Sequence, residues 1–108
     1  MGKHFILNLY ECPFELLDSK EFIRMLLYKA VKEVKANLLN LAVHKFDPQG
    51  VTGFALLSES HISIHTWPET GQAAVDIFTC GKCDPQLGCD FIISQLKSER
   101  NTLQVIER

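Results

Sequence analysis

The sequence predicts an α+β fold, a two-layer sandwich in which one antiparallel sheet carries two helices on one face. Three observations lead to this prediction. Apolar residues alternate with a period of two in several short segments separated by turns. Two other segments have the apolar spacing of amphipathic helices. The length of 108 residues, of which 46% are hydrophobic and 22% charged, fits a single globular domain, residues 1–108.

The first half of the chain is expected to contain strands on both sides of a helix. Asp18 and Glu21 resemble a capping box at the start of this helix, with Asp in place of Ser or Thr. Pro48 and Gly50 are typical turn residues and predict a turn at Asp47–Gly50. The expected elements are a strand at Lys3–Tyr10, a helix from Phe22 to Val34, and a hairpin of strands Leu41–Phe46 and Val51–Leu57.

The second half is expected to contain further strands and a second helix. Period-two alternation resumes at Ile62 and Ile64, after a polar interruption. Asp84 and Pro85 mark the start of the helix, because proline is tolerated in a first helical turn. The expected elements are a strand through Ile62 and Ile64, a turn at Trp67–Gly71, a strand at Ala73–Thr79, a helix at Gln86–Ser98 and a strand at Thr102–Ile106.

One face of the predicted sheet is left without helices. Strand parity allows a set of polar residues to lie on it. A sheet face of this kind is either solvated or part of an interface. The residues are His61, Ser63, His65, Asp76 and Cys80.

Charge and hydropathy exclude several partners. The chain has 11 Lys and Arg against 13 Asp and Glu, a net charge of −2, which argues against nucleic acid and against anionic membranes. No stretch approaches the roughly 20 apolar residues of a membrane span, and the N-terminus lacks the pattern of a signal peptide. We therefore expect a cytoplasmic protein whose four cysteines are reduced.

The motif Cys80-Gly81-Lys82-Cys83 lies between an expected strand and an expected helix. One interpretation is a redox-active dithiol, because a helix N-terminus lowers the pKa of a thiol. A second is a zinc site completed by Cys89 and a histidine. A third is that Cys83 and Cys89 are ordinary buried thiols. The late position of the motif and the small number of clustered ligands favour the third.

Ser60, His65 and Cys80 are candidates for chemistry, because a hydroxyl, an imidazole and a thiol on one sheet can act as nucleophile, base and acid. The chain has no Gly-x-Ser-x-Gly motif, which disfavours an ordinary hydrolase triad. Trp67, two residues after His65, is a candidate either for the core or for stacking on a ligand.

Two long segments resemble one enzyme family, and the resemblance covers nearly the whole chain. Residues 57–69, LSESHISIHTWPE, and residues 74–81, AVDIFTCG, look like the core of the prokaryotic S-adenosylmethionine decarboxylases, which are short, self-processing and pyruvoyl-dependent. Residues 10–12 and 46–53 are also similar to that family. The run Ser-Glu-Ser-His…His-Thr-Trp-Pro-Glu is long and specific.

The resemblance implies a proenzyme that is cut between Glu59 and Ser60. Ser60 attacks the Glu59 carbonyl, and elimination and hydrolysis then convert Ser60 into a pyruvoyl group. Residues 1–59 become the β chain and residues 60–108 the α chain. His65 is implied as the proton acceptor of the elimination, and Thr52 stands where the family usually has a serine that assists processing.

The resemblance also implies the decarboxylation of S-adenosylmethionine, which makes the aminopropyl donor for spermidine. The substrate amine forms a Schiff base with the pyruvoyl group, which takes up the electrons released with CO₂. Cys80 is implied as the acid that protonates the product carbon. Phe46 and Trp67 are implied to stack on the adenine and Glu69 to hydrogen-bond the ribose hydroxyls. The resemblance implies no metal.

Family members of this length are homodimers of processed protomers, with sites near the subunit interface. A two-fold interface would cover the open sheet face and give a four-layer α/β/β/α assembly. Two alternatives stay open: a pyruvoyl-dependent arginine or ornithine decarboxylase on the same fold, and an unprocessed regulatory homologue. Phe46, Trp67 and Glu69 argue against the first alternative, and the intact Glu59–Ser60 pair argues against the second.

Overall fold

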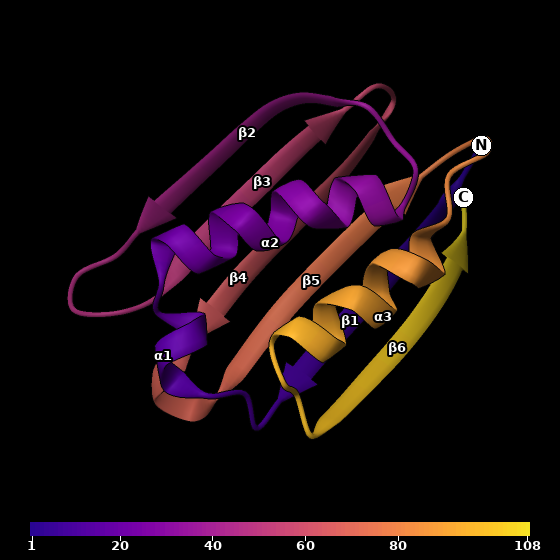
Figure 1. Ribbon diagram of the computed structural model, residues 1–108. Coiled ribbons are helices and arrows are strands. Elements are labelled where there is room, and N and C mark those ends of the chain that lie inside the picture. The colour runs from indigo at the N-terminus through magenta and orange to yellow at the C-terminus, as the bar shows by residue number, and fades with distance from the viewer.

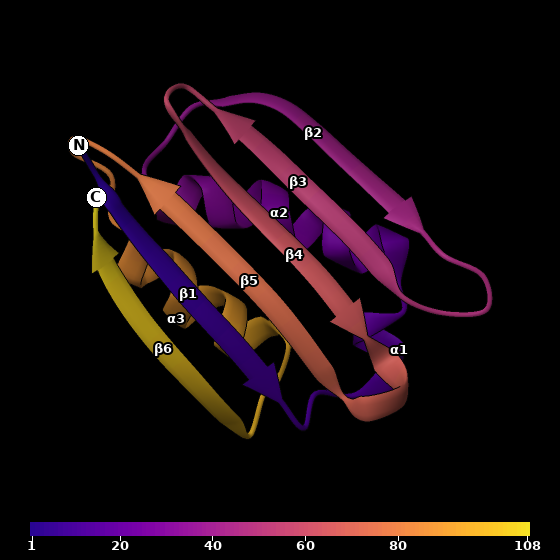
Figure 2. The same ribbon diagram turned by 180° about the vertical axis from the view of Figure 1, so that it is seen from behind.

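The computed structural model describes residues 1–108 as two layers, a six-stranded sheet and the helices that pack on one of its faces (Figure 1). From behind, the sheet faces the viewer and no helix covers it (Figure 2). None of the helices has the length and apolar character needed to span a membrane. The elements are β1 (Lys3–Tyr10), α1 (Phe14–Leu17), α2 (Lys20–Glu33), β2 (Leu38–Lys45), β3 (Val51–Leu57), β4 (Ser60–Trp67), the 3₁₀ helix η1 (Pro68–Thr70), β5 (Gln72–Thr79), α3 (Pro85–Gln95) and β6 (Arg100–Glu107).

The sheet has the strand order β2-β3-β4-β5-β1-β6, and every neighbouring pair is antiparallel. This confirms the predicted α+β class, with all helices on one face. The strands from β2 to β5 form a meander, and β1 lies between β5 and β6. As a result, β4 and β5, which carry most of the candidate site, lie in the middle of the sheet.

The hydrophobic core lies between the sheet and the two long helices. Leu7 of β1 and Ile64 of β4 are buried on the sheet side, and Leu27 of α2 and Ile92 of α3 on the helix side. Helix α2 approaches β3 closely because Gly53 has no side chain, and a Cβ there would lie 2.6 Å from Leu27 Cδ1. Burial of each large apolar side chain contributes roughly 1.5–3 kcal/mol to the stability of this two-layer fold.

The start of α2 differs from the prediction. Ser19, not Asp18, is the N-cap, and its hydroxyl accepts a hydrogen bond from the Phe22 N–H at 3.0 Å. Asp18 instead accepts a hydrogen bond from the Gly50 N–H at 2.9 Å. The sequence pattern could not separate these two roles, because Asp and Ser are both good N-cap residues.

Other boundaries shift by a few residues. Strand β2 begins at Leu38 rather than Leu41, because an edge strand with little buried surface has weak alternation. Helix α3 ends at Gln95 rather than Ser98. The short helix at Phe14–Leu17 has no counterpart in the prediction, since a single turn is too short to show helical periodicity.

The predicted helix-free face is present. Along β4, buried residues alternate with residues that point away from the helices, and β5 shows the same alternation. Several large apolar side chains on this face or at its margin are exposed. The outward residues include His61, Ser63, His65 and Asp76, and the exposed apolar ones include Phe54, Leu56 and Trp67.

Candidate active site

The bond between Glu59 and Ser60 lies in the tight turn that joins β3 to β4. Leu57 and Ser60 pair at the ends of the two strands, so only Ser58 and Glu59 form the loop. Glu59 has a φ of 60°. This left-handed conformation costs a residue other than glycine about 1–2 kcal/mol. The peptide bond that follows Glu59 therefore adjoins a strained residue.

The Ser60 hydroxyl is buried and unpaired. Ser60 is 7% exposed, and its Oγ is the only buried side-chain oxygen or nitrogen without a hydrogen-bond partner. Leaving such a group unpaired costs about 1–3 kcal/mol. Because of this cost, unpaired buried hydroxyls are rare in native proteins and often have a function. An unpaired Ser60 hydroxyl has free lone pairs and can therefore act as a nucleophile.

Cys80 lies beside the same turn. It follows the last residue of β5, and its thiol donates a hydrogen bond to the Glu59 carbonyl oxygen at an S···O distance of 3.4 Å. This oxygen would gain negative charge if Ser60 attacked its carbonyl carbon, and a donor in this position stabilises that charge. Glu59, Ser60 and Cys80 therefore gather at one end of the sheet.

A second group of predicted residues lies at the opposite end of β4. Thr52 Oγ1 and His65 Nδ1 are 2.9 Å apart across the β3–β4 pair. The His65 and Trp67 rings are 6.5 Å apart between centroids and tilted by 41°. Both His65 and Trp67 are exposed on the open face. This group offers a hydroxyl, an imidazole and a broad aromatic surface to a ligand.

Phe46 and Glu69 lie near this second group. Phe46 follows β2 in the loop of the β2–β3 hairpin, and its side chain is exposed, with the ring edge-on to His44 at 4.6 Å between centroids. Glu69 is an exposed residue of η1, directly after Trp67 and Pro68. The loop and η1 both adjoin the strand end that carries Trp67, so the three predicted substrate-binding residues share one end of the sheet.

The two groups do not meet within this chain. Ser60 and His65 are five residues apart on β4, about 16 Å along a strand at roughly 3.3 Å per residue. Their side chains also point to opposite faces of the sheet, because an odd separation reverses the direction in a strand. Burial agrees with this, since Ser60 is buried and His65 is exposed. His65 is therefore out of reach of the Ser60 of its own chain.

The open face carries a third group, which the sequence indicated only in part. His4 Nε2 and Asp76 Oδ1 are 2.9 Å apart, and His61 stacks on Phe54 with 5.5 Å between ring centroids. Burial, and secondly the nearby His4, lower the pKa of His61, which favours the neutral ring in this stack. Strand parity indicated Asp76 and His61. The contact with His4 depends on the pairing of β1 with β5, which local patterns do not reveal.

The remaining cysteines lack the features of a metal or dithiol centre. No three His, Cys, Asp or Glu side chains gather as a metal site. Cys89 is fully buried, and burial raises its pKa to about 12. Burial, and secondly the nearby Cys80, raise the pKa of Cys83. These two thiols are therefore protonated near neutral pH, unlike the reactive thiol of a redox centre.

A cavity of about 520 Å³ also reaches Cys80. Its walls come from the start of β1, the ends of β5 and β6 and the start of α3. None of the predicted substrate-binding residues lines it. This cavity therefore does not join Cys80 to the aromatic group around Trp67.

Comparisons with known proteins agree with the motif. The sequence model of the S-adenosylmethionine decarboxylase family matches residues 3–108. The S-adenosylmethionine decarboxylase proenzyme of Prochlorococcus marinus strain MIT 9211 is 54% identical over 109 residues, which cover 100% of this chain and 89% of that protein. The proenzyme of the same name from Methanococcus maripaludis is 50% identical, with 100% and 89% covered. The crystal structure of the adenosylmethionine decarboxylase from Aquifex aeolicus VF5 has a TM-score of 0.92 at 43% identity and covers 100% of this chain and 90% of that one.

Proposed function

Because the chain belongs to the S-adenosylmethionine decarboxylase family, we propose that it is a proenzyme that cuts its own backbone between Glu59 and Ser60 and then decarboxylates S-adenosylmethionine. One observation carries the first step. The buried, unpaired Ser60 hydroxyl follows Glu59, which has a left-handed backbone conformation and whose carbonyl oxygen accepts a hydrogen bond from the Cys80 thiol. The nucleophile, the carbonyl that it would attack and a donor for the developing charge are thus adjacent.

The proposed cut uses atoms of the chain and one water molecule. Ser60 Oγ attacks the Glu59 carbonyl carbon, the C–N bond breaks, and the nitrogen of residue 60 takes up the hydroxyl proton, so the amide becomes an ester. A base then removes the Cα proton of residue 60, the Glu59 carboxylate leaves, and dehydroalanine remains. Addition of water releases ammonia and leaves a pyruvoyl group on residues 60–108, while residues 1–59 end at Glu59.

The pyruvoyl group supplies an electrophilic carbonyl, an electron sink that no unmodified side chain offers. The neighbourhood of residue 60 fits such a group, because the thiol of Cys80 lies beside the backbone that becomes the new chain end. We assign to Cys80 the protonation of the product carbon. The product of this reaction would serve as the aminopropyl donor for spermidine.

The aromatic group at the other end of β4 is the proposed substrate-binding surface. Phe46 and Trp67 expose flat rings that can stack on an adenine, and the Glu69 carboxylate can accept hydrogen bonds from ribose hydroxyls. The substrate is also a sulfonium cation, and an aromatic face attracts a cation by roughly 0.5–2 kcal/mol. Arginine and ornithine have no adenosine to occupy this surface.

An assay of CO₂ release tests the substrate. Purified, processed enzyme is given S-adenosylmethionine, arginine or ornithine at equal concentrations. We expect release from S-adenosylmethionine alone. Sodium cyanoborohydride added during turnover should fix the substrate amine to the first residue of the α chain, which mass spectrometry detects. A clear preference for a free amino acid would overturn the substrate assignment.

Replacing Trp67 by Ala should raise KM for S-adenosylmethionine by about 5- to 30-fold, because stacking on a base is worth about 1–2 kcal/mol. The expected kcat stays within about twofold, since stacking stabilises ground state and transition state alike. Steady-state kinetics on processed enzyme measures both constants. Tyr28→Ala, which removes an exposed aromatic ring from α2 on the other side of the molecule, is the matched control. An unchanged KM in Trp67→Ala would contradict the stacking role.

We further propose that two copies of the chain complete the site. In one protomer, His65 is out of reach of Ser60, and the face that carries His65 leaves the apolar side chains of Phe54 and Leu56 exposed. A two-fold axis that lies between two stacked sheets and runs across their strands exchanges the strand ends. When the open faces meet about such an axis, His65 of the partner subunit can lie over the Glu59–Ser60 turn. The partner's aromatic group can then lie at the pyruvoyl end.

Coexpression of two inactive variants tests whether the site is shared. His65→Ala alone should stay as one chain, because the elimination lacks its base. Coexpressed with Ser60→Ala, which keeps His65, the His65→Ala chain should be cut. The two variants carry different tags, so mass spectrometry shows which of the two chains has been cut. A His65→Ala chain that stays intact in verified mixed dimers would show that His65 does not act across the interface.

A further inference from the structure

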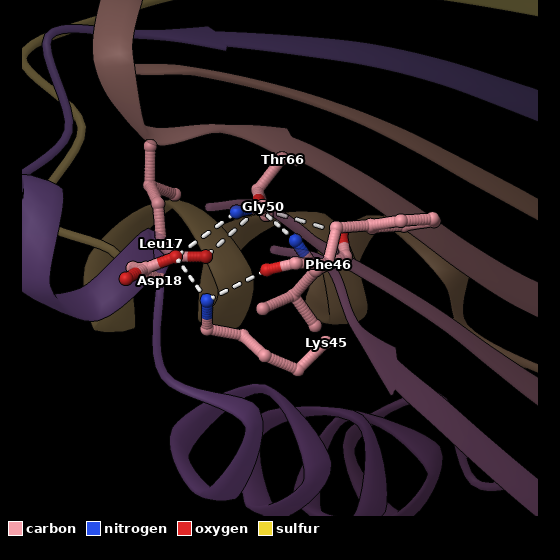
Figure 3. Close-up of polar contacts among 7 residues, drawn as sticks. Leu17, Asp18, Lys45, Phe46, Gly50 and Thr66 are labelled. Carbon is pink, nitrogen blue, oxygen red and sulfur yellow. Dashed lines mark hydrogen bonds and ion pairs between the residues drawn. The ribbon is translucent and has the colours of Figure 1, made fainter. Parts of the chain in front are cut away.

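A polar network around Asp18 holds the loop that carries Phe46, and the steps proposed above do not use it (Figure 3). Asp18 Oδ1 accepts a hydrogen bond from the Gly50 N–H at 2.9 Å and lies 3.0 Å from Lys45 Nζ. Lys45 Nζ donates to the Phe46 carbonyl oxygen at 2.9 Å. The Phe46 N–H donates to the Gly50 carbonyl oxygen at 2.8 Å. Both ends of the loop are thus tied to one carboxylate.

A second pair of hydrogen bonds, made by Thr66, lies next to this network. Thr66 Oγ1 accepts a hydrogen bond from the Val51 N–H at 2.9 Å and donates one to the Leu17 carbonyl oxygen at 2.8 Å. Thr66 is the residue before Trp67, and Leu17 is the residue before Asp18. Leu17, the last residue of α1, and Asp18, which follows it, therefore hold both the end of β4 at Thr66 and the loop of Phe46 (Figure 3).

The chemistry of Asp18 suits this function. The Gly50 N–H first, and Lys45 second, lower the pKa of the Asp18 carboxyl, so it is ionised at neutral pH. Hydrogen bonds to an ionised acceptor are stronger than neutral ones. Gly50 has a φ of 107°, which glycine adopts readily and other residues rarely do. Glycine at this position therefore lets the loop turn its N–H towards Asp18 without steric cost.

We propose that Asp18 is a positioning residue for the substrate, because it fixes the loop from which Phe46 presents its ring to the adenine. This inference rests on the proposed function, which assigns Phe46 to the adenine. The Phe46 side chain is about half exposed, and its ring packs edge-on against His44, so the position of the ring depends on the loop that carries it. Without Asp18, substrate binding would have to order the loop and would be weaker. The ground state and the transition state lose the same amount of binding free energy, so the substitution raises KM and leaves kcat unchanged.

The test compares Asp18→Ala, Asp18→Asn, Phe46→Ala and the double variant Asp18→Ala/Phe46→Ala, each processed and normalised to pyruvoyl content by mass spectrometry. We expect Asp18→Ala to raise KM for S-adenosylmethionine about 5- to 10-fold with kcat unchanged. Asp18→Asn keeps an acceptor for the Gly50 N–H and should raise KM less. The double variant should match Phe46→Ala alone, because Asp18 acts through Phe46.

Each of the following results would overturn the inference. If Asp18→Ala lowers only the thermal midpoint and leaves KM unchanged, its role is structural. If Asp18→Ala multiplies the KM of Phe46→Ala by its full factor, it acts elsewhere. If Phe46→Ala leaves KM unchanged, the adenine assignment in the proposed function fails as well, which separates this result from the first two. If Asp18→Ala does not fold, Lys45→Met replaces it in the same test. A rise in the KM of Lys45→Met that vanishes in the Phe46→Ala background supports the inference. An unchanged KM in Lys45→Met overturns it.

Discussion

Ser60→Ala is expected to remain a single chain of 108 residues and to release no CO₂ from S-adenosylmethionine. Alanine has no oxygen to attack the Glu59 carbonyl, so neither the ester nor the pyruvoyl group can form. The expected loss is complete, because the same atom is required for both. Denaturing electrophoresis and a CO₂ assay measure the two losses.

The fold of Ser60→Ala should be intact. The Ser60 hydroxyl is buried without a partner, so its removal takes away a cost of about 1–3 kcal/mol rather than a hydrogen bond. The uncut Ser60→Ala precursor should therefore unfold at a temperature no lower than the uncut wild-type chain. Ser58→Ala, which removes the other hydroxyl of the same turn, should be cut normally. Two fragments or measurable turnover from Ser60→Ala would contradict the role of this hydroxyl.

Cys80→Ala is expected to lose turnover by about 100-fold or more, because positioned general acids contribute roughly 10²–10⁴-fold. It should also be cut more slowly than the wild-type chain. The Cys80 thiol donates to the Glu59 carbonyl oxygen, and loss of a donor at a developing oxyanion slows the step that creates the charge. Turnover per pyruvoyl group, and the time course of cutting, measure the two effects separately.

Cys80→Ser separates the two roles of Cys80. A hydroxyl can still donate to the Glu59 carbonyl oxygen but is a far weaker acid than a thiol, so cutting should recover while turnover stays low. Cys83→Ser is the matched control and should cut and turn over normally, which would also dispose of a dithiol mechanism. Normal turnover in Cys80→Ala would mean that another group protonates the product.

The sheet and its two long helices were predictable because their signals are local. Residues Lys3–Tyr10 and Val51–Leu57 show an alternation that requires no knowledge of partners, and both strands have the predicted bounds. The predicted N-cap was wrong because Asp18 and Ser19 are both residue types that favour the N-cap position. Only the hydrogen bond from the Gly50 N–H, far along the chain, decides between them. Strand order was not predictable either, since β1 lies between β5 and β6 through contacts distant in sequence.

The site residues were predicted from the resemblance to a known family, whereas their arrangement is visible only in the structure. Parity in the sequence already puts Ser60 and His65 on opposite sides of one strand, and the burial of Ser60 and the exposure of His65 agree with it. Three further features have no local signature. These are the unpaired Ser60 hydroxyl, the left-handed conformation of Glu59 and the thiol hydrogen bond from Cys80. They arise where the β3–β4 turn meets the end of β5, and only the packed chain brings these segments together.

The intact mass of freshly purified wild-type protein tests the central claim most directly. We expect two chains, residues 1–59 ending in an ordinary carboxylate and residues 60–108 beginning with a pyruvoyl group in place of Ser60 and its free amine. One unbroken chain with an unmodified Ser60, in a preparation that still releases CO₂ from S-adenosylmethionine, would contradict the proposed self-cleavage and its role in the reaction.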